Sequence, residues 1–279
     1  MSSYELTANV SLLFKEVPLL ERFAAAADAG FGSVEMWWPF ETASPTGNEV
    51  DELIGAIDKA GVRLTGLNFF AGNMPGGERG IVSRLDRRSE FVANVEVVAA
   101  IAERTGCSGF NALYGQRQPG ASEAEEDALA IDNLVLAAQR LQPLGGTILI
   151  EPLSRGLNGA YPIETAEDAA TLIAAVRERS GTENVALLFD TFHLANNDED
   201  LAAVIREHHD LIGHVQLADT PGRGEPGSGS IDFAAVFAGL VEQGYRGGIA
   251  CEYAPTVPTG DSLGWVAEFP MLRLTAGKV

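Results

Sequence analysis

The sequence has few cysteines, few histidines and few basic residues. Its 279 residues include 2 cysteines, 4 histidines and 19 lysines and arginines, against 39 aspartates and glutamates. So few cysteines in so long a chain argue against a disulfide framework, and we expect Cys107 and Cys251 to be buried, reduced thiols. The net charge of −20 opposes phosphate contacts and therefore nucleic-acid binding.

Long apolar runs and a targeting segment are also missing. No stretch has the roughly 18 uninterrupted apolar residues that a membrane span needs. Residues 1–16 have neither a basic stretch before a long apolar core nor an arginine-rich amphipathic pattern. We therefore expect a soluble, cytoplasmic protein that does not act at a membrane.

Short apolar runs alternate with helix-like stretches along the whole chain. We predict strands near 6–10, 33–38, 63–68, 107–112, 146–150, 185–190, 212–217 and 248–252. We predict helices near 17–29, 48–60, 84–105, 122–142, 164–179, 199–208, 231–243 and 262–275. Eight such units predict an α/β fold, a single (β/α)8 TIM barrel over residues 1–279, since these barrels use about 250 residues as one domain.

An open, doubly wound sheet is the alternative fold. It is disfavoured because no G-x-G-x-x-G motif follows the first strand, which also removes the main sign of a nucleotide cofactor. The irregular segments 69–83, 114–121, 152–162 and 218–230 all follow strands. In a barrel they would crowd over the same mouth.

Four late apolar runs each end on an oxygen-bearing side chain: Glu151, Asp190, Gln216 and Glu252. One such residue alone is usually a helix cap or a solvated loop residue. Four in succession would form an arc at the C-terminal mouth of a barrel, where active sites assemble. Three gathered carboxylates call for a compensating cation, and the absence of Cys and His from the set favours Mg²⁺ or Mn²⁺ over structural Zn²⁺.

Several motifs surround these residues: ANVSLLFKEVPLLERFAAAADAGFGSVEMWWPF near the start, GERGI at 77–81, IEP at 150–152, FDTFH at 189–193, HVQLAD at 214–219, RGEPGSG at 223–229 and CEY at 251–253. In these motifs the sequence resembles the hydroxypyruvate isomerase family of xylose isomerase-like barrels. The resemblance covers nearly the whole chain in the same order.

The resemblance implies a divalent metal held by Glu151, Asp190, Gln216 and Glu252, with acid and base roles for Glu151 and Glu252. Gln216 discriminates between relatives, because sugar 3-epimerases and barrel endonucleases of base-excision repair usually have His at that strand end. One departure leaves the substrate open: FFAGNM at 69–74 stands where typical members read L-P-A-G-D-W.

The implied reaction moves a carbonyl between neighbouring carbons. Hydroxypyruvate and 2-hydroxy-3-oxopropanoate (tartronate semialdehyde) interconvert by removal of a proton from one carbon and its return at the next through a cis-enediolate. A divalent metal would stabilise that enediolate without redox chemistry, so no redox cofactor is needed. Two carboxylates on opposite sides of the substrate, Glu151 and Glu252, could alternate as base and acid.

Three further residues are candidates for substrate binding: His193, Arg223 and Asn68. His193, just past a strand end, could bind a substrate oxygen or merely satisfy loop carbonyls. Arg223, in the glycine-rich segment PGRGEPGSG, could take a substrate carboxylate or form a loop ion pair with a residue such as Glu225. For Asn68 a loop-capping role is equally compatible.

Other mouth residues carry weaker signals. By alternation His214 faces the barrel interior on the same side as Gln216, which indicates a supporting or packing role. Glu35 and Asn111 also end strands and could line the mouth or cap a loop. Aromatic residues near the same strand ends could form apolar walls, although a core role is favoured for each: Trp37, Trp38, Phe69 and Phe70.

Rival functions remain on the same scaffold. They are a 2-oxotetronate isomerase, a ketose 3-epimerase, a metal-dependent phosphodiesterase on DNA and a non-catalytic carbohydrate-sensing barrel. The 4 histidines and the charge of −20 are poor material for the phosphodiesterase, and a sensing barrel would be expected to lose one of the four ligands. We expect a small hydroxy or oxo acid as partner, and a homo-oligomer is compatible with the sequence.

Overall fold

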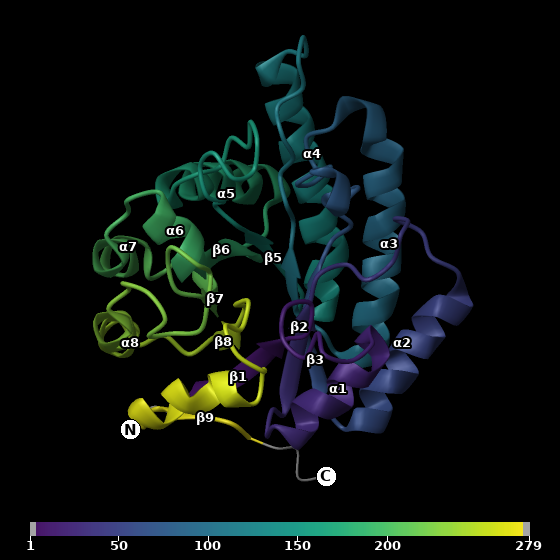
Figure 1. The fold of residues 1–279 in the computed structure, drawn as a ribbon. Helices are drawn as coiled ribbons and strands as arrows, with labels where there is room; N and C mark the ends of the chain where they lie inside the picture. The colour runs from purple at the N-terminus through teal and green to yellow at the C-terminus, as the bar shows by residue number, and fades with distance from the viewer. Residues whose placement is uncertain (1–3, 276–279) are drawn as a thin grey trace.

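A computed structural model describes residues 4–275 and shows a closed parallel barrel (Figure 1). Its strands are β1 Tyr4–Asn9, β2 Ser33–Met36, β3 Arg63–Asn68, β4 Gly109–Asn111, β5 Thr147–Ile150, β6 Val185–Asp190, β7 Ile212–Leu217 and β8 Gly248–Cys251. Neighbours in sequence pair with one another, and β1 closes the barrel by pairing with both β2 and β8. The predicted (β/α)8 barrel is confirmed.

Helices cover the outside of the barrel (Figure 1). They are α1 Leu19–Asp28, α2 Gly47–Ala60, α3 Arg88–Thr105, α4 Glu123–Leu141, α5 Ala166–Ser180, α6 Thr191–Asn196, α7 Leu201–His208 and α8 Phe233–Glu242. The local sequence sets their ends. A capping box between Thr46 and Glu49 starts α2, and Gly61, at a φ of 69°, ends it. The same arrangement starts α5 at Thr165 and ends it at Gly181.

Apolar side chains form two separate cores. The larger one fills the space between strands and helices, with Phe23, Phe91 and Phe110 fully buried. A small second cluster consists of Leu149, Ala186 and Leu188 and lies inside the barrel. Because side chains alternate along a strand, the interior position that follows Leu149 is residue 151 and the one that follows Leu188 is residue 190. The sequence therefore turns polar just above the interior cluster.

Both cysteines are buried, and neither is in a disulfide, as expected. Among the helices of residues 4–275, none combines the length and the apolar composition that a membrane crossing requires.

The predicted helix over 262–275 is wrong. Residues Asp261–Glu268 form the 3-10 helix η4, and the chain then enters the short strand β9 Leu272–Arg273, which pairs with β1. Pro270 lies between them and cannot continue a helix. Phe269 packs on Phe237 of α8 with 4.8 Å between ring centroids, which holds the turn in place.

The short helix α6 was not predicted. It has 6 residues, too few for an apolar repeat to become visible. The feature that marks the start of this helix is its N-cap residue. Asp190, the last residue of β6, accepts hydrogen bonds from the backbone N–H groups of Phe192 and His193. Shorter 3-10 turns lie at η1 Met74–Gly76, η2 Leu85–Arg87 and η3 Gln142–Leu144.

Asp219 organises the glycine-rich loop after β7. Its side chain is 1% exposed and accepts four backbone hydrogen bonds of 2.8–3.0 Å. The donors are Thr220, Gly227, Gly229 and Ile231. These bonds tie both ends of the loop to one carboxylate, so Arg223 is carried on an ordered segment.

Close packing in this loop gives a matched test. A Cβ at Gly229 would lie 2.1 Å from the Thr220 carbonyl oxygen, whereas one at Gly222 would meet nothing within 4 Å. We expect Gly229→Ala to lower the free energy of unfolding by about 1–3 kcal/mol and Gly222→Ala to change it by less than about 0.5 kcal/mol. Urea unfolding measures both, and equal stability of the two variants would contradict the packing.

Candidate metal centre and catalytic pocket

A cavity of about 920 Å³ opens at the C-terminal end of the barrel. Segments 69–83, 152–162 and 218–230 each contribute to its walls, as expected, whereas residues 114–121 do not. Five of the predicted site residues line it: Asn68, Glu151, His193, Arg223 and Glu252. The loops therefore form a pocket directly over the strand ends that the sequence singled out.

The four predicted metal ligands lie at one level of the barrel. Asp190 and Gln216 are paired in register on β6 and β7. Glu151 directly follows β5 and Glu252 directly follows β8. None of the four is more than 4% exposed. Three carboxylates and one amide thus meet in a buried space.

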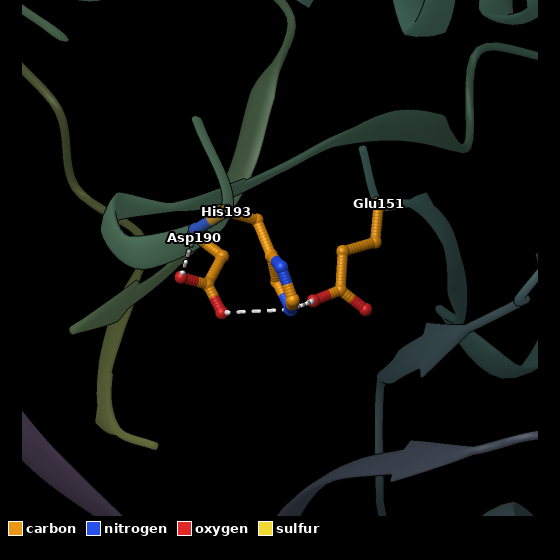
Figure 2. A group of neighbouring side chains, drawn as sticks. All are labelled: Glu151, Asp190 and His193. Atoms are coloured by element: carbon orange, nitrogen blue, oxygen red, sulfur yellow. Dashed lines mark hydrogen bonds and ion pairs between the residues drawn. The ribbon is translucent and has the colours of Figure 1, made fainter. Parts of the chain in front are cut away.

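His193 lies between two of these carboxylates. Its Nε2 is 3.7 Å from Glu151 Oε1 and 3.9 Å from Asp190 Oδ2 (Figure 2). One ligand atom from each of the three residues lies within 4.8 Å of the others, close enough for a metal ion to be held among them. The short helix α6 produces this geometry, because it turns the chain back over the strand end immediately after Asp190.

The proton of His193 can be assigned from its neighbours. The backbone N–H of Ser154 donates to Nδ1 at 3.0 Å, so Nδ1 is an acceptor and Nε2 carries the hydrogen. Burial, with the charges of Arg223 and Arg79, lowers the pKa of His193 well below its ordinary value. The ring is therefore neutral and offers an N–H donor to the cavity, which suits a substrate oxygen better than a metal.

Two buried oxygens at the centre lack a hydrogen-bond donor. Asp190 Oδ1 accepts the two bonds that start α6, while Oδ2 accepts none. Gln216 Nε2 donates to Glu35 at 2.7 Å, while Gln216 Oε1 has no partner. Leaving a buried polar atom unpaired costs about 1–3 kcal/mol. These hard oxygen donors fit a divalent cation such as Mg²⁺ or Mn²⁺.

Glu35 fixes the orientation of Gln216 from across the barrel. Its carboxylate accepts hydrogen bonds from Asn9 at 2.9 Å, His214 at 2.6 Å and Gln216 at 2.7 Å. Burial alone would raise the pKa of Glu35, but the charge of His214 and these hydrogen bonds bring it below its ordinary value. Since a carboxylate only accepts, the amide must present Nε2 to Glu35 and Oε1 to the site.

The sequence placed His214 correctly on the interior side, but it did not identify Glu35 as the residue that joins His214 to Gln216. Strands β2 and β7 are not neighbours, so only the closed interior brings Glu35 and Gln216 together. The alternation of side chains along a strand could have indicated this contact. Residues 33, 35 and 37 share the interior face of their strand, as residues 214 and 216 do of theirs.

Glu252 is held by an indole and a guanidinium. Its Oε1 accepts from Trp37 Nε1 at 2.8 Å and from Arg223 Nη2 at 3.0 Å. The same Arg223 nitrogen is 3.6 Å from Asp190 Oδ2, and the guanidinium lies over the Phe192 ring at 5.3 Å. Arg223 does not pair with Glu225, which bonds Thr256 instead.

Burial raises the pKa of the clustered carboxyl groups. Burial first, and then the charge of Asp190, raises the pKa of Glu151 to about 8. Burial also raises the pKa of Asp190 and, more strongly, that of Glu252, although the charge of Arg223 opposes both shifts. Full ionisation of this cluster therefore needs more positive charge than Arg223 supplies.

The remaining candidates divide between the pocket and the core. Asn111 is buried and donates to Glu151 Oε2 at 2.6 Å, so it supports the site. Trp37, Trp38 and Phe70 line the cavity, and Phe70 also belongs to the larger apolar core. Phe69 is 1% exposed and packs on Phe91 and Phe110 in the core.

Known proteins resemble this chain in sequence over nearly its whole length. Residues 23–269 match the model of the family described as Xylose isomerase-like TIM barrel. A Streptomyces coelicolor protein named "Putative hydroxypyruvate isomerase" is 45% identical over 92% of this chain and 94% of its own length. A "2-oxo-tetronate isomerase" of Pectobacterium atrosepticum is 34% identical over 92% and 95%.

Solved structures share the fold. A crystal structure titled as an AP endonuclease, family 2, from Brucella melitensis superposes with a TM-score of 0.85 at 32% identity, covering 96% of this chain and 99% of that one.

The clustered carboxyl groups predict how the stability of the metal-free protein depends on pH. Glu151 keeps its proton up to about pH 8 when folded, against an ordinary value of 4.5, so the folded state binds more protons between these values and loses stability as the pH rises. His193 has the opposite effect only below 6.5. We expect the Tm of chelator-treated protein to fall from pH 6.5 to pH 8.

The Glu151→Gln variant is the control, because residue 151 can then no longer ionise and the slope should become smaller. A Tm that rises over the same interval in the unmodified chain would contradict the assignment.

Proposed function

We propose a reaction from the premise that the chain belongs to the hydroxypyruvate isomerase family of xylose isomerase-like TIM barrels and is an isomerase. The reaction is the interconversion of hydroxypyruvate and 2-hydroxy-3-oxopropanoate through a cis-enediolate. The observation that carries it is a pair of buried glutamates, Glu151 and Glu252, that line one cavity directly beyond the ends of β5 and β8. Two carboxyl groups positioned on the same cavity can act in turn as base and acid.

Glu151, Asp190, Gln216 and Glu252 would hold a divalent cation, Mg²⁺ or Mn²⁺. The support is the unpaired buried Oδ2 of Asp190 and Oε1 of Gln216, together with the excess of negative charge around them. When bound, the cation would supply Lewis-acid polarisation of the substrate oxygens and balance the carboxylates.

The protein side chains carry the proton transfers. One of Glu151 and Glu252 removes a proton from C3 of hydroxypyruvate, and the other returns a proton to C2. The hydroxyl proton moves from O3 to O2, so the product is the isomeric hydroxy-aldehyde acid. His193, neutral and with its hydrogen on Nε2, donates to a substrate oxygen as negative charge develops there. Trp37 and Arg223 keep Glu252 in one rotamer.

A 2-oxotetronate is the second candidate substrate. The cavity of about 920 Å³ has room for an acid longer than three carbons, and the Pectobacterium relative carries that name. We propose to separate the two by offering metal-loaded protein hydroxypyruvate, 2-oxotetronates and free ketoses in deuterated water. Proton NMR should show solvent deuterium entering the carbon next to the carbonyl of the true substrate. Deuterium entering none of the acids would overturn the proposed reaction.

Removing the proposed metal or one glutamate should stop turnover. Chelator treatment should abolish isomerisation and added Mg²⁺ or Mn²⁺ should restore it. Glu252→Gln keeps the hydrogen bond to Trp37 but cannot transfer protons, so we expect kcat to fall by about 10²-fold or more. Glu242→Gln, at an exposed position on α8, is the matched control. Full activity in the chelated protein would exclude this mechanism.

The orientation of Gln216 gives a prediction that does not depend on turnover. Glu35→Gln replaces one acceptor oxygen with a donor, so Glu35 no longer holds both His214 and the Gln216 amide. We expect Mn²⁺ affinity to fall by about 10- to 100-fold, as is typical when a group that orients a ligand is lost. Calorimetric titration measures it, with the exposed Glu52→Gln on α2 as the control. Unchanged affinity would show that Gln216 is not a ligand.

A further inference from the structure

Three arginines line the cavity, and they differ in how their charge is balanced: Arg79, Arg87 and Arg223. Arg87 pairs with Glu78 at 2.9 Å and with Glu90 at 2.6 Å. Arg223 pairs with Glu252 at 3.0 Å and with Asp190 at 3.6 Å. Arg79 makes no ion pair with any carboxylate within residues 4–275. Its charge is left for a ligand.

Arg79 is nevertheless held in place. Its Nε donates to Asn158 Oδ1 at 3.0 Å, and its Nη1 donates to the carbonyl oxygens of Met74 and Glu78 at 3.1 and 2.8 Å. All three acceptors are neutral, so they position the guanidinium without cancelling its charge. The other terminal nitrogen, Nη2, bonds nothing in the described part of the chain. A fixed guanidinium with one free terminal nitrogen can donate charge-assisted hydrogen bonds to an anion.

The same loop that holds Arg79 also holds His193. Asn158 is 8% exposed, and its Nδ2 donates to the Ser154 carbonyl at 3.0 Å, which leaves its Oδ1 for Arg79. Ser154 in turn donates to His193 Nδ1. The backbone beside Arg79 is also constrained, because a Cβ at Gly80 would lie 2.0 Å from the Leu113 carbonyl oxygen. Hydrogen bonds through Asn158 and Ser154 thus link the position of Arg79 to that of His193.

We infer that Arg79 binds the carboxylate of the substrate and so selects small 2-oxo or 2-hydroxy acids over neutral hydroxycarbonyl compounds. An anion entering a cavity lined by the buried carboxyl groups of Glu151 and Glu252, in a chain of net charge −20, needs a positive group that is not already paired. Arg223, the sequence-based choice for this role, already has two carboxylate partners.

The inference rests on the proposed function for the reaction, but binding of an acid can be tested without turnover. D-glycerate has the three-carbon frame and the carboxylate, and its amide is the neutral counterpart. Trp37 and Trp38 line the cavity, so tryptophan fluorescence can follow binding of both compounds to the metal-loaded protein. We expect Arg79→Gln to weaken D-glycerate binding by about 10- to 100-fold, as for loss of a charge-assisted hydrogen bond, and to change binding of the amide by less than about 3-fold.

Two further variants keep the test decisive. Asn158→Asp leaves Arg79 intact and gives it a carboxylate partner, so it should weaken D-glycerate binding if Arg79→Gln does not fold. Arg84→Gln removes a neighbouring arginine that is paired with Glu78 and Asp86 and does not line the cavity. It should bind both compounds like the unmodified protein.

Kinetics complete the assignment. With hydroxypyruvate as substrate, Arg79→Gln should raise KM by the same factor as it weakens D-glycerate binding, with kcat changed much less. Absence of D-glycerate binding in the unmodified protein, equal loss of acid and amide, or an acid-specific loss in Arg223→Lys but not in Arg79→Gln would each overturn the role of Arg79. If D-glycerate binding depends on Arg79 but hydroxypyruvate is not isomerised, the acid site stands and the proposed reaction fails.

Discussion

The cost of burying three carboxyl groups together at the barrel mouth determines how the surrounding structure is built. Glu151, Asp190 and Glu252 are each almost fully buried, and burial raises the pKa of all three. Each has its own local support: Asn111 for Glu151, the first N–H groups of α6 for Asp190, and an indole with a guanidinium for Glu252. The local donors only partly offset the cost of ionisation, because the pKa values stay raised. A bound cation would supply the positive charge that this site lacks.

The barrel interior provides the support that neighbouring strands cannot. Glu35 reaches Gln216 across the interior, because β2 and β7 do not pair with each other. Room for this carboxylate comes from β3, where a Cβ at Gly66 would lie 2.9 Å from the Glu35 Cβ. The apolar cluster around Leu149 inside the barrel is small. The interior positions nearer the mouth are occupied by polar side chains that hydrogen-bond to one another. Stability of the fold therefore depends mainly on the outer core between strands and helices.

Strands and strand-end residues could be predicted from the sequence because both follow from short-range periodicity. Apolar runs end at the polar residue that starts the mouth, so Glu151, Asp190, Gln216 and Glu252 were visible without a structure. The bond between Glu35 and Gln216 joins residues 181 positions apart and depends on closure of the barrel, which no local pattern records. The C-terminal helix was wrongly predicted because apolar spacing over 262–275 outweighed one proline. The carboxylate partner of each cavity arginine also could not be predicted from the sequence, because these ion pairs form only when the loops fold over one another.

One principle accounts for the polarity of the site: the fold binds one end of a two-ended polar group and leaves the other end without a hydrogen-bond partner. Ser154 takes Nδ1 of His193, so Nε2 becomes the donor. Glu35 takes Nε2 of Gln216, so Oε1 becomes the acceptor. The start of α6 takes Oδ1 of Asp190 and leaves Oδ2. Neutral oxygens take two nitrogens of Arg79 and leave its charge. Because each group has only one free end, the cavity offers a fixed set of donors, acceptors and charge, and this set fits a small acid together with a hard cation.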